Sequence, residues 1–173
     1  MKTLLLSLIA VLVLLQPSSV VAESWLGKSS RSLEDLDPVF RGKVQRVLDR
    51  LRRQGYQPEI MSTYRSARRQ DLIFELSQVA RWLGRKPWTQ ARGGQSCHNS
   101  VDAQGQPAAL AVDILDEQRQ SGDDSAKFYH ALGKAAAAQS LGWGGRWKRS
   151  NPYWKRKGLG WDPGHLQSWR CRN

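Results

Sequence analysis

The chain has 173 residues, of which 27 are Lys or Arg and 15 are Asp or Glu, so its formal net charge is +12. This length suits one domain with a real hydrophobic core, and the absence of internal repeats argues against a second domain. A charge of this size draws a protein toward polyanions such as nucleic acid, anionic lipid or an anionic cell wall.

The first 22 residues have the pattern of a cleaved signal peptide. Lys2 precedes an apolar run over 3–15, and a small-residue cleavage site follows at 20–22. The run is shorter than the roughly 20 apolar residues of a membrane span, which leaves an uncleaved anchor as the alternative. Removal of residues 1–22 leaves 151 residues and a net charge of +11, because Lys2 is lost. We therefore expect a periplasmic or secreted protein.

The first predicted helix follows a polar entry segment. Residues 23–36 lack a sustained hydrophobic period, so we expect them to be extended and to precede a single domain over 37–173. Asp37 has the position of an N-cap and Pro38 that of the first helical residue. Apolar residues then recur at helical spacing as far as Gly55, where we expect the helix to end.

A short strand is predicted over 58–63, before a second helix. Ser66 can cap this helix, which we expect to end before Gly84. The apolar residues expected on its inner face are Leu72, Ile73, Leu76, Val79, Ala80 and Leu83. Residues 85–106 are rich in Gly, Gln, Ser and Pro, which indicates loops flanking short strands.

The remaining predicted elements are a strand over 109–115, a third helix over 124–140 and a final strand over 165–169. The helix should bury Phe128, Leu132, Ala135 and Ala136, and the final strand should present His165, Gln167 and Trp169 on one face. Helices and strands do not alternate regularly enough for a parallel doubly wound sheet. The expected fold class is therefore α+β, a single domain with helices packed on a small antiparallel sheet.

Two of the three histidines, His98 and His165, occur in short motifs that together could bind zinc. Two imidazoles and one carboxylate fill three corners of a zinc tetrahedron and leave the fourth for water, as in catalytic zinc sites. Asp113 is favoured as the carboxylate because its Ala-Val-Asp-Ile context is apolar and strand-like. Asp102 is the alternative, in a segment rich in Gly and Gln. The third histidine, His130, is interpreted as structural.

These motifs resemble those of the zinc peptidoglycan peptidases, the family of D-alanyl-D-alanine carboxypeptidases and of the L-alanyl-D-glutamate endopeptidases of phage endolysins and bacterial walls. The resemblance extends over about 55–167 and implies a Hedgehog/DD-peptidase-like fold. Its landmarks are Tyr64-Arg65-Ser66 with Gln70, Thr89-Gln90-Ala91, Gly94-Gln95-Ser96-Cys97-His98-Asn99, Ala111-Val112-Asp113-Ile114, Gly142-Trp143-Gly144-Gly145 and Asp162-Pro163-Gly164-His165.

The resemblance implies an exported metallopeptidase that hydrolyses the peptidoglycan stem peptide with metal-activated water. The Gly-Gln-Ser-x-His-Asn string and the Trp-Gly-Gly turn are closer to the endopeptidase branch. We therefore expect an L-alanyl-D-glutamate endopeptidase. The alternatives are a D-alanyl-D-alanine carboxypeptidase on the same scaffold and a wall-binding module without catalysis.

The resemblance also implies roles for individual residues. One Zn²⁺ would be held by His98, Asp113 and His165. Asp162 would act as the base toward water, and its position three residues before His165, in a Pro-Gly turn, is consistent with that role. Arg65 would stabilise the oxyanion of the tetrahedral intermediate. The expected substrate-binding residues are Ser96 and Gln70.

Two departures from the family pattern concern spacing and charge. The family usually has its histidine and aspartate ligands seven residues apart, whereas fifteen positions separate His98 from Asp113. An insertion over about 100–109 that bulges outward as a loop would explain the difference. Arg146 follows Trp-Gly-Gly where the endopeptidase pattern more often has aspartate, which affects the expected substrate preference.

Cys97 and Cys171 are the only cysteines, and each is close in sequence to a candidate ligand. Export implies an oxidising compartment, so we expect these two cysteines to form a disulfide. Free thiols and zinc ligation by Cys97 are the alternatives. The expected partners are the peptidoglycan stem peptide and the anionic cell wall. Nucleic acid is not expected, and the protein is expected to be a monomer.

Overall fold

The computed structural model describes residues 27–85, 87–118, 122–148 and 152–171. The signal peptide predicted for residues 1–22 lies outside the described residues. Within the described part of the chain, no helix combines the length and the apolar character that a membrane crossing requires.

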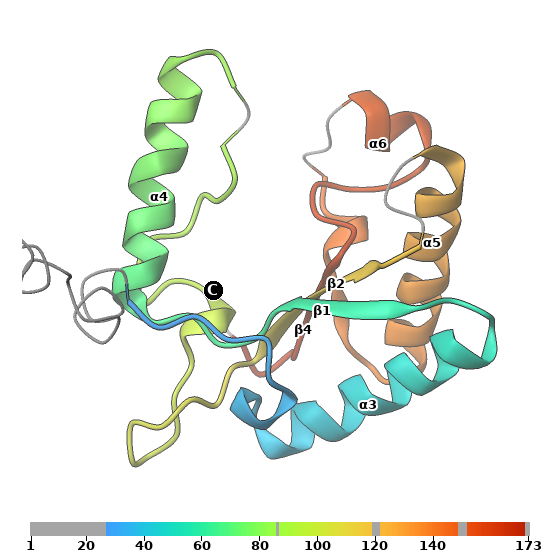
Figure 1. The fold of residues 1–173 in the computed structure, drawn as a ribbon, viewed down its shortest axis with the longest axis horizontal. Coiled ribbons are helices and arrows are strands. Elements are labelled where there is room, and N and C mark those ends of the chain that lie inside the picture. The colour runs from blue at the N-terminus through green and yellow to red at the C-terminus, as the bar shows by residue number, and fades with distance from the viewer. Residues whose placement is uncertain (1–26, 86, 119–121, 149–151, 172–173) are drawn as a thin grey trace, which may run out of the picture.

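A four-stranded antiparallel sheet forms the centre of the fold (Figure 1). Its strands pair in the order β1-β2-β4-β3, so that β2 and β4, which are far apart in the sequence, are neighbours. The bounds are β1 Pro58–Ser62, β2 Ala111–Asp116, β3 Gly142–Trp143 and β4 His165–Gln167. The predicted antiparallel sheet is confirmed.

The hydrophobic core lies between this sheet and two helices, α3 (Pro38–Arg53) and α5 (Gly122–Ala138). α3 begins as predicted, because the carboxylate of Asp37 accepts hydrogen bonds from the first free backbone amides of the helix. The four residues predicted to face inward from α5 are all buried; they are Phe128, Leu132, Ala135 and Ala136. The α+β class is therefore confirmed.

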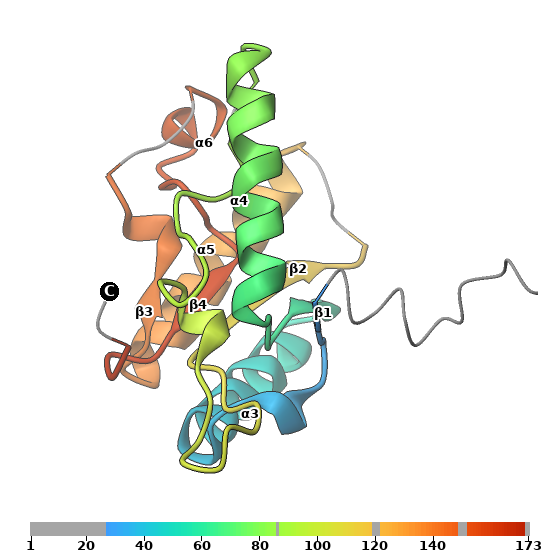
Figure 2. The ribbon, with the colours of Figure 1, turned by 90° about the vertical axis from the view of Figure 1, so that its left-hand side faces the viewer.

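The second predicted helix forms as α4 (Ala67–Trp82), and the hydroxyl of Ser66 accepts a hydrogen bond from the Arg69 amide at its start. Of the residues predicted on its inner face, Ala80 is buried and Leu72 and Ile73 are half-buried, but the prediction is wrong for the other three. Leu76, Val79 and Leu83 are 47%, 55% and 60% exposed. The buried residues are Gln70, Ser77 and Ala80. α4 stands away from the body of the fold (Figure 1), and the chain that follows it runs back along its side (Figure 2).

Shorter elements complete the fold and correct two further expectations. The entry segment is not extended throughout, because residues 33–35 form the 3-10 helix η1 (Leu33–Asp35). The final strand ends at Gln167, and Trp169 is 71% exposed beyond it, so the predicted alignment of Trp169 with the two preceding residues is wrong. The other short helices are η2 (Cys97–Asn99), η3 (Gly144–Arg146) and α6 (Pro152–Arg156).

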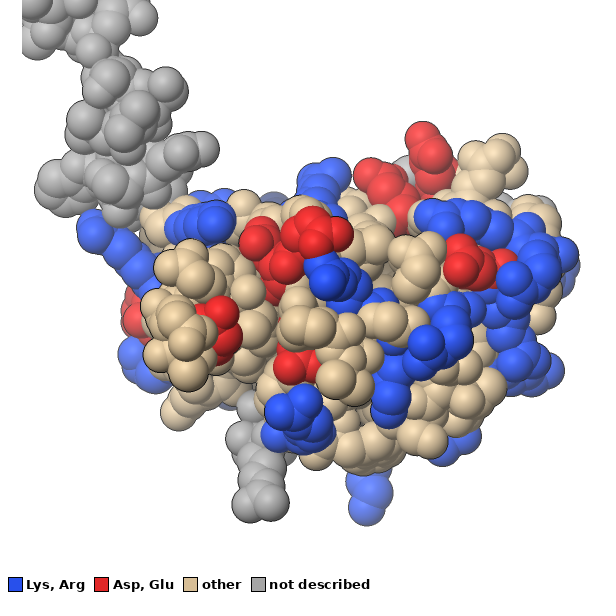
Figure 3. All heavy atoms as spheres, turned by 90° about the horizontal axis from the view of Figure 1, so that it is seen from below, with Lys and Arg blue, Asp and Glu red and all other residues tan. Residues whose placement is uncertain are grey.

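Basic side chains are widespread on the surface. Figure 3 shows the face that includes α3, where Lys and Arg side chains cover a large area and acidic side chains lie among them. The last turn of α3 contributes three of these basic residues, Arg50, Arg52 and Arg53. This distribution agrees with the net positive charge of the sequence.

Candidate metal centre and active site

Two adjacent strands place a carboxylate beside an imidazole. Asp113 on β2 and His165 on β4 are register partners, and Asp113 Oδ1 lies 2.9 Å from His165 Nδ1. Their neighbours Val112, Ile114 and Leu166 are fully buried in the core. Since successive strand residues point to opposite faces, Asp113 and His165 lie on the face away from the core.

The second imidazole comes from η2. The hydroxyl of Ser96 accepts a hydrogen bond from the His98 amide and caps this short helix. The His98 Nδ1 atom lies 2.5 Å from the carbonyl oxygen of Thr63, so Nδ1 carries the proton and donates it. Nε2 is then the free nitrogen, and it lies 3.3 Å from Asp113 Oδ2.

One atom from each of His98, Asp113 and His165 lies within 4.8 Å of the other two, so these residues could hold a metal ion. Ligands at about 2.0–2.1 Å from a tetrahedral zinc are about 3.3–3.5 Å apart, which the His98 to Asp113 separation matches. The donor set, two imidazoles and one carboxylate, fits Zn²⁺. The carboxylate of Asp102 instead accepts hydrogen bonds from amides of its own loop, away from this group.

The electrostatics of the centre favour a charged carboxylate. Burial acts to raise the pKa of Asp113, but the two neighbouring imidazoles, His98 and then His165, lower that pKa well below its usual range. Burial also acts to lower the pKa of His165, but the hydrogen bond and charge of Asp113 raise it above its usual value. The Asp113 carboxylate is therefore suited to be an anionic ligand at neutral pH.

Arg65 lies against the same carboxylate, with Nη2 3.7 Å from Asp113 Oδ2. Its guanidinium donates to Ser62 Oγ at 3.0 Å and to Gln70 Oε1 at 2.8 Å. Its backbone carbonyl accepts a hydrogen bond from the side chain of Asn99. These contacts fix the guanidinium beside the candidate metal centre, and Arg65 is one of the residues that line the pocket.

The structure places Gln70 behind Arg65 and not at the pocket surface. Gln70 has no exposed area, and its amide nitrogen donates to Thr89 Oγ1 and to the carbonyl oxygen of Ala91. The side chain therefore holds Arg65 and the 89–91 segment in place, in contrast to the expected contact with substrate. Ser96 does line the pocket.

Asp162 reaches the site through a tight turn. Its carbonyl oxygen accepts a hydrogen bond from the His165 amide at 3.1 Å, which closes the Asp-Pro-Gly-His turn. Gly144 packs against this turn so closely that a Cβ atom there would collide with the Asp162 carbonyl oxygen. The Trp-Gly-Gly sequence thus allows η3 to support the segment that carries Asp162.

A pocket of about 520 Å³ joins these groups, including Arg65, Asp113 and Asp162. Two further groups of residues line its wall. One group comes from α4 and the segment that follows it, namely Ile73, Trp88, Thr89, Gln90 and Ala91, and the other comes from the region between β3 and β4, namely Trp147, Lys148 and Trp161. The Trp147 ring also packs on the His165 imidazole, at a centroid distance of 5.1 Å.

Sequence reasoning missed Gln167 as a site residue. Its Oε1 atom lies 3.1 Å from His165 Nε2, and the side chain lines the pocket. If Nε2 carries the proton and donates it to Gln167, Nδ1 is left to face Asp113. The signal that could have identified Gln167 is the period of two along β4, which puts it on the same face as His165.

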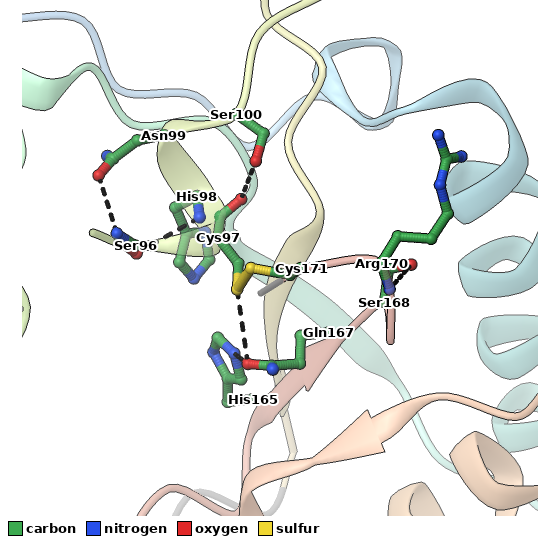
Figure 4. Close-up of a disulfide and its surroundings, with 10 residues drawn as sticks. All are labelled: Ser96, Cys97, His98, Asn99, Ser100, His165, Gln167, Ser168, Arg170 and Cys171. Atoms are coloured by element: carbon green, nitrogen blue, oxygen red, sulfur yellow. Dashed lines mark hydrogen bonds between the residues drawn. A yellow bond between two sulfur atoms is a disulfide. The ribbon is translucent and has the colours of Figure 1, made fainter. Parts of the chain in front are cut away.

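The predicted disulfide is confirmed, because Cys97 and Cys171 are bonded, with a Cα to Cα distance of 5.8 Å (Figure 4). Cys97 directly precedes the candidate ligand His98, and Cys171 follows the strand that carries His165. Figure 4 shows that the disulfide lies next to the Gln167 side chain, whose Oε1 is 3.7 Å from Cys97 Sγ. The disulfide thus joins the two segments that supply the histidines.

A two-histidine, one-carboxylate centre in an open pocket, beside a further carboxylate and a fixed arginine, is the arrangement of a mononuclear metal-dependent hydrolase. A profile of the VanY family, described as D-alanyl-D-alanine carboxypeptidase, matches residues 34–169. The chain belongs to this family of peptidoglycan peptidases, which confirms the predicted family and enzyme class. A sequence comparison with curated proteins finds no match.

Solved structures share the fold at low sequence identity. VanYB in complex with D-alanine-D-alanine is 21% identical, with a TM-score of 0.53 over 81% of this chain and 76% of its own. A Zn(II) complex of a variant of the vancomycin-resistance D,D-pentapeptidase VanY is 20% identical, with a TM-score of 0.54 over 76% and 71%.

The LD-carboxypeptidase LdcB is a third structure with this fold. It is 18% identical, with a TM-score of 0.52 over 76% of this chain. The match spans only 58% of the LdcB chain, so this protein covers little more than half the length of that relative.

Proposed function

We propose that this protein is an exported zinc endopeptidase that cleaves the bond between L-alanine and D-glutamate in the peptidoglycan stem peptide. The observation that carries the proposal is the convergence of the three candidate ligands with Asp162 and Arg65 in one pocket. With a volume of about 520 Å³, this pocket has room for a short segment of the stem peptide around the bond that is cut.

The metal would be held by His98 Nε2, an oxygen of Asp113 and His165 Nδ1. When bound there, Zn²⁺ supplies Lewis-acid chemistry, polarising a carbonyl and lowering the pKa of water to about 7. The family membership and the Zn(II) in a neighbour of the same fold support the choice of metal.

Two side chains of the pocket would assist the reaction, one by transferring a proton and the other by stabilising the negative charge that develops on the carbonyl oxygen. Asp162 accepts a proton from the attacking water and returns it to the amine that leaves. Arg65 donates to the oxygen that becomes negative as water adds to the peptide carbonyl, a role worth about 3–4 kcal/mol when such donors are removed. Ser62 and Gln70 hold that guanidinium in place before substrate arrives.

The chosen bond suits the charge of the site. In the stem peptide the α-carboxylate of D-glutamate is free and lies directly after the bond to L-alanine. Lys148 on one pocket wall and Arg65 near the centre offer cations to such a carboxylate. The motifs of the endopeptidase branch in the sequence point to the same bond.

A D-alanyl-D-alanine carboxypeptidase is the second candidate, favoured by the description of the matching family profile. Mass analysis of purified disaccharide-pentapeptide after digestion separates the two. Release of the stem peptide from D-glutamate onward, with L-alanine left on the sugar, supports the endopeptidase. Loss of the terminal D-alanine alone overturns it in favour of the carboxypeptidase.

The assignment of Asp162 has its own test. Asp162→Ala should retain one bound zinc per chain but lower hydrolysis at least 100-fold, because the proton acceptor is removed. Asp102→Asn is the matched control, since that carboxylate serves only its own loop. Unchanged turnover in Asp162→Ala would show that another group is the base.

Export and assembly belong to the same proposal. We infer cleavage after residue 22 and action on the cell wall as a monomer, supported by the leader pattern and the positive charge. Sequencing the N-terminus of the exported protein tests the cleavage site, and its sedimentation tests the monomer.

A further inference from the structure

Trp88 is the most exposed aromatic side chain of the pocket. It lies on the pocket wall with Ile73 of α4, yet 67% of it is accessible to solvent. It belongs to the segment that follows α4 and runs back along that helix (Figure 2). An exposed aromatic ring of this size in a catalytic pocket offers an apolar surface that a bound ligand could cover.

The backbone beneath this ring is unusually well fixed. Ser77 Oγ accepts hydrogen bonds from the amides of both Trp88 and Thr89, at 3.1 and 3.3 Å. Gln70 donates to Thr89 Oγ1 and to the carbonyl oxygen of Ala91, at 3.0 and 2.8 Å. Ser77 and Gln70 are both fully buried. The buried polar side chains of α4 thus hold the Trp88 segment in one position against the helix.

The other tryptophans near the site are less suited to receive a ligand. Trp147 packs on the imidazole of His165, and Trp161 is half-buried. Trp82 is 84% exposed on α4 but does not line the pocket. Trp88 alone among these four joins high exposure to a place on the pocket wall.

We propose that Trp88 is a stacking platform for the amino sugar that carries the stem peptide. The inference rests on the proposed endopeptidase function, because L-alanine is joined by an amide to the lactyl group of that sugar. The sugar ring therefore lies one residue from the bond that is cut. One face of a pyranose ring presents C–H groups, which match the negative face of an indole.

This placement makes a prediction about substrate choice. The enzyme binds the glycan-linked stem better than the free stem peptide, because only the former brings a ring to Trp88. A carboxypeptidase acting at the far end of the stem would gain nothing from such a platform, since several residues separate the terminal D-alanine from the sugar.

The test compares two substrates with the zinc-loaded mature chain: the disaccharide-tetrapeptide and the same tetrapeptide with an acetyl group in place of the sugar. We expect Trp88→Ala to lower kcat/KM by about tenfold for the sugar-linked substrate and by less than twofold for the acetylated one. Trp88→Phe should recover part of the loss, and Trp82→Ala, the matched control, should change neither value.

The outcomes are distinct. Equal losses on both substrates would show that Trp88 serves the peptide or the pocket wall, and no loss would show that it serves neither; both results overturn the inference while the endopeptidase stands. Removal of the terminal D-alanine only, by the unmodified enzyme, overturns the proposed function and this inference with it. Zinc content and thermal unfolding of Trp88→Ala, each unchanged, show that the variant is folded.

Discussion

Two oxygen atoms decide which nitrogen of each histidine faces the metal centre. The carbonyl oxygen of Thr63 accepts from His98 Nδ1, and Gln167 Oε1 lies beside His165 Nε2. Partners of this kind fix the tautomer and the ring orientation of a ligand, and so tune its affinity for metal. The two histidines therefore present different nitrogens, Nε2 and Nδ1, to one carboxylate, that of Asp113.

Gln167 can be tested without reference to activity. Gln167→Leu should weaken zinc affinity by about 10- to 100-fold, because His165 loses the acceptor that orients it. Gln167→Glu, which keeps an acceptor oxygen, should retain the affinity. Competition with a chromogenic chelator measures both values. An unchanged dissociation constant in the leucine variant would mean that the turn before β4 alone orients the ring.

At the scale of elements, α4 buries polar side chains, Gln70 and Ser77, and leaves several of its large apolar side chains exposed. Its partner is the backbone of residues 88–91, which presents amide and carbonyl groups in place of side-chain surface. Buried backbone groups must be hydrogen-bonded, so Ser77 and Gln70 are worth more there than leucine. The apolar residues of the opposite face remain in solvent.

This arrangement predicts that replacing a small polar residue of α4 costs more unfolding free energy than replacing a large apolar one. Ser77→Ala should lower the free energy of unfolding by about 1–3 kcal/mol, because the Trp88 and Thr89 amides lose their acceptor. Leu76→Ala should change it by less than about 0.5 kcal/mol, since Leu76 is half exposed. Urea unfolding followed by circular dichroism gives both values, and a larger cost for Leu76→Ala would contradict the structure.

The disulfide links two elements that are 74 positions apart in the sequence. Replacing both cysteines by serine should lower the free energy of unfolding by about 2–4 kcal/mol, because the unfolded chain gains freedom. It should also weaken zinc binding, since the bond joins the segments of His98 and His165. Urea unfolding and chelator competition measure the two effects, and the reduced wild-type protein should match the variant. Unaltered zinc affinity would limit the disulfide to a structural role.

At the scale of the whole molecule, the candidate metal centre brings together η2, β2 and β4, each of which supplies one candidate ligand. A ligand that binds only the folded chain stabilises it by mass action, by about 2.7 kcal/mol at a concentration one hundred times its dissociation constant. The stability of the fold should therefore depend on zinc.

Chelation tests this dependence. Removal of zinc should lower the Tm of the purified protein, and added zinc should restore it. His98→Ala should show no further decrease on chelation, because one of its three ligands is already lost. Scanning calorimetry measures these shifts. A Tm of the wild type that does not respond to chelation would exclude the metal from these three elements.

The sequence by itself determined most of the elements and which residues could form the metal centre. The N-cap of Asp37, the helical period of α5 and the apolar, strand-like context of Asp113 in β2 are local patterns, and each produced the expected element. The choice of Asp113 over Asp102 also followed from local context, since an apolar strand holds a carboxylate more rigidly than a polar loop.

Only the tertiary structure decided which side chains support that centre. The buried face of α4, the partners of each histidine and the position of Trp88 on the pocket wall depend on contacts between segments far apart in the chain. Gln70 illustrates the difference: its place in a motif suggested substrate contact, and its burial behind Arg65 gave it another task. Local periodicity reports which residues share a face, but the element packed against that face decides whether apolar or polar side chains belong there.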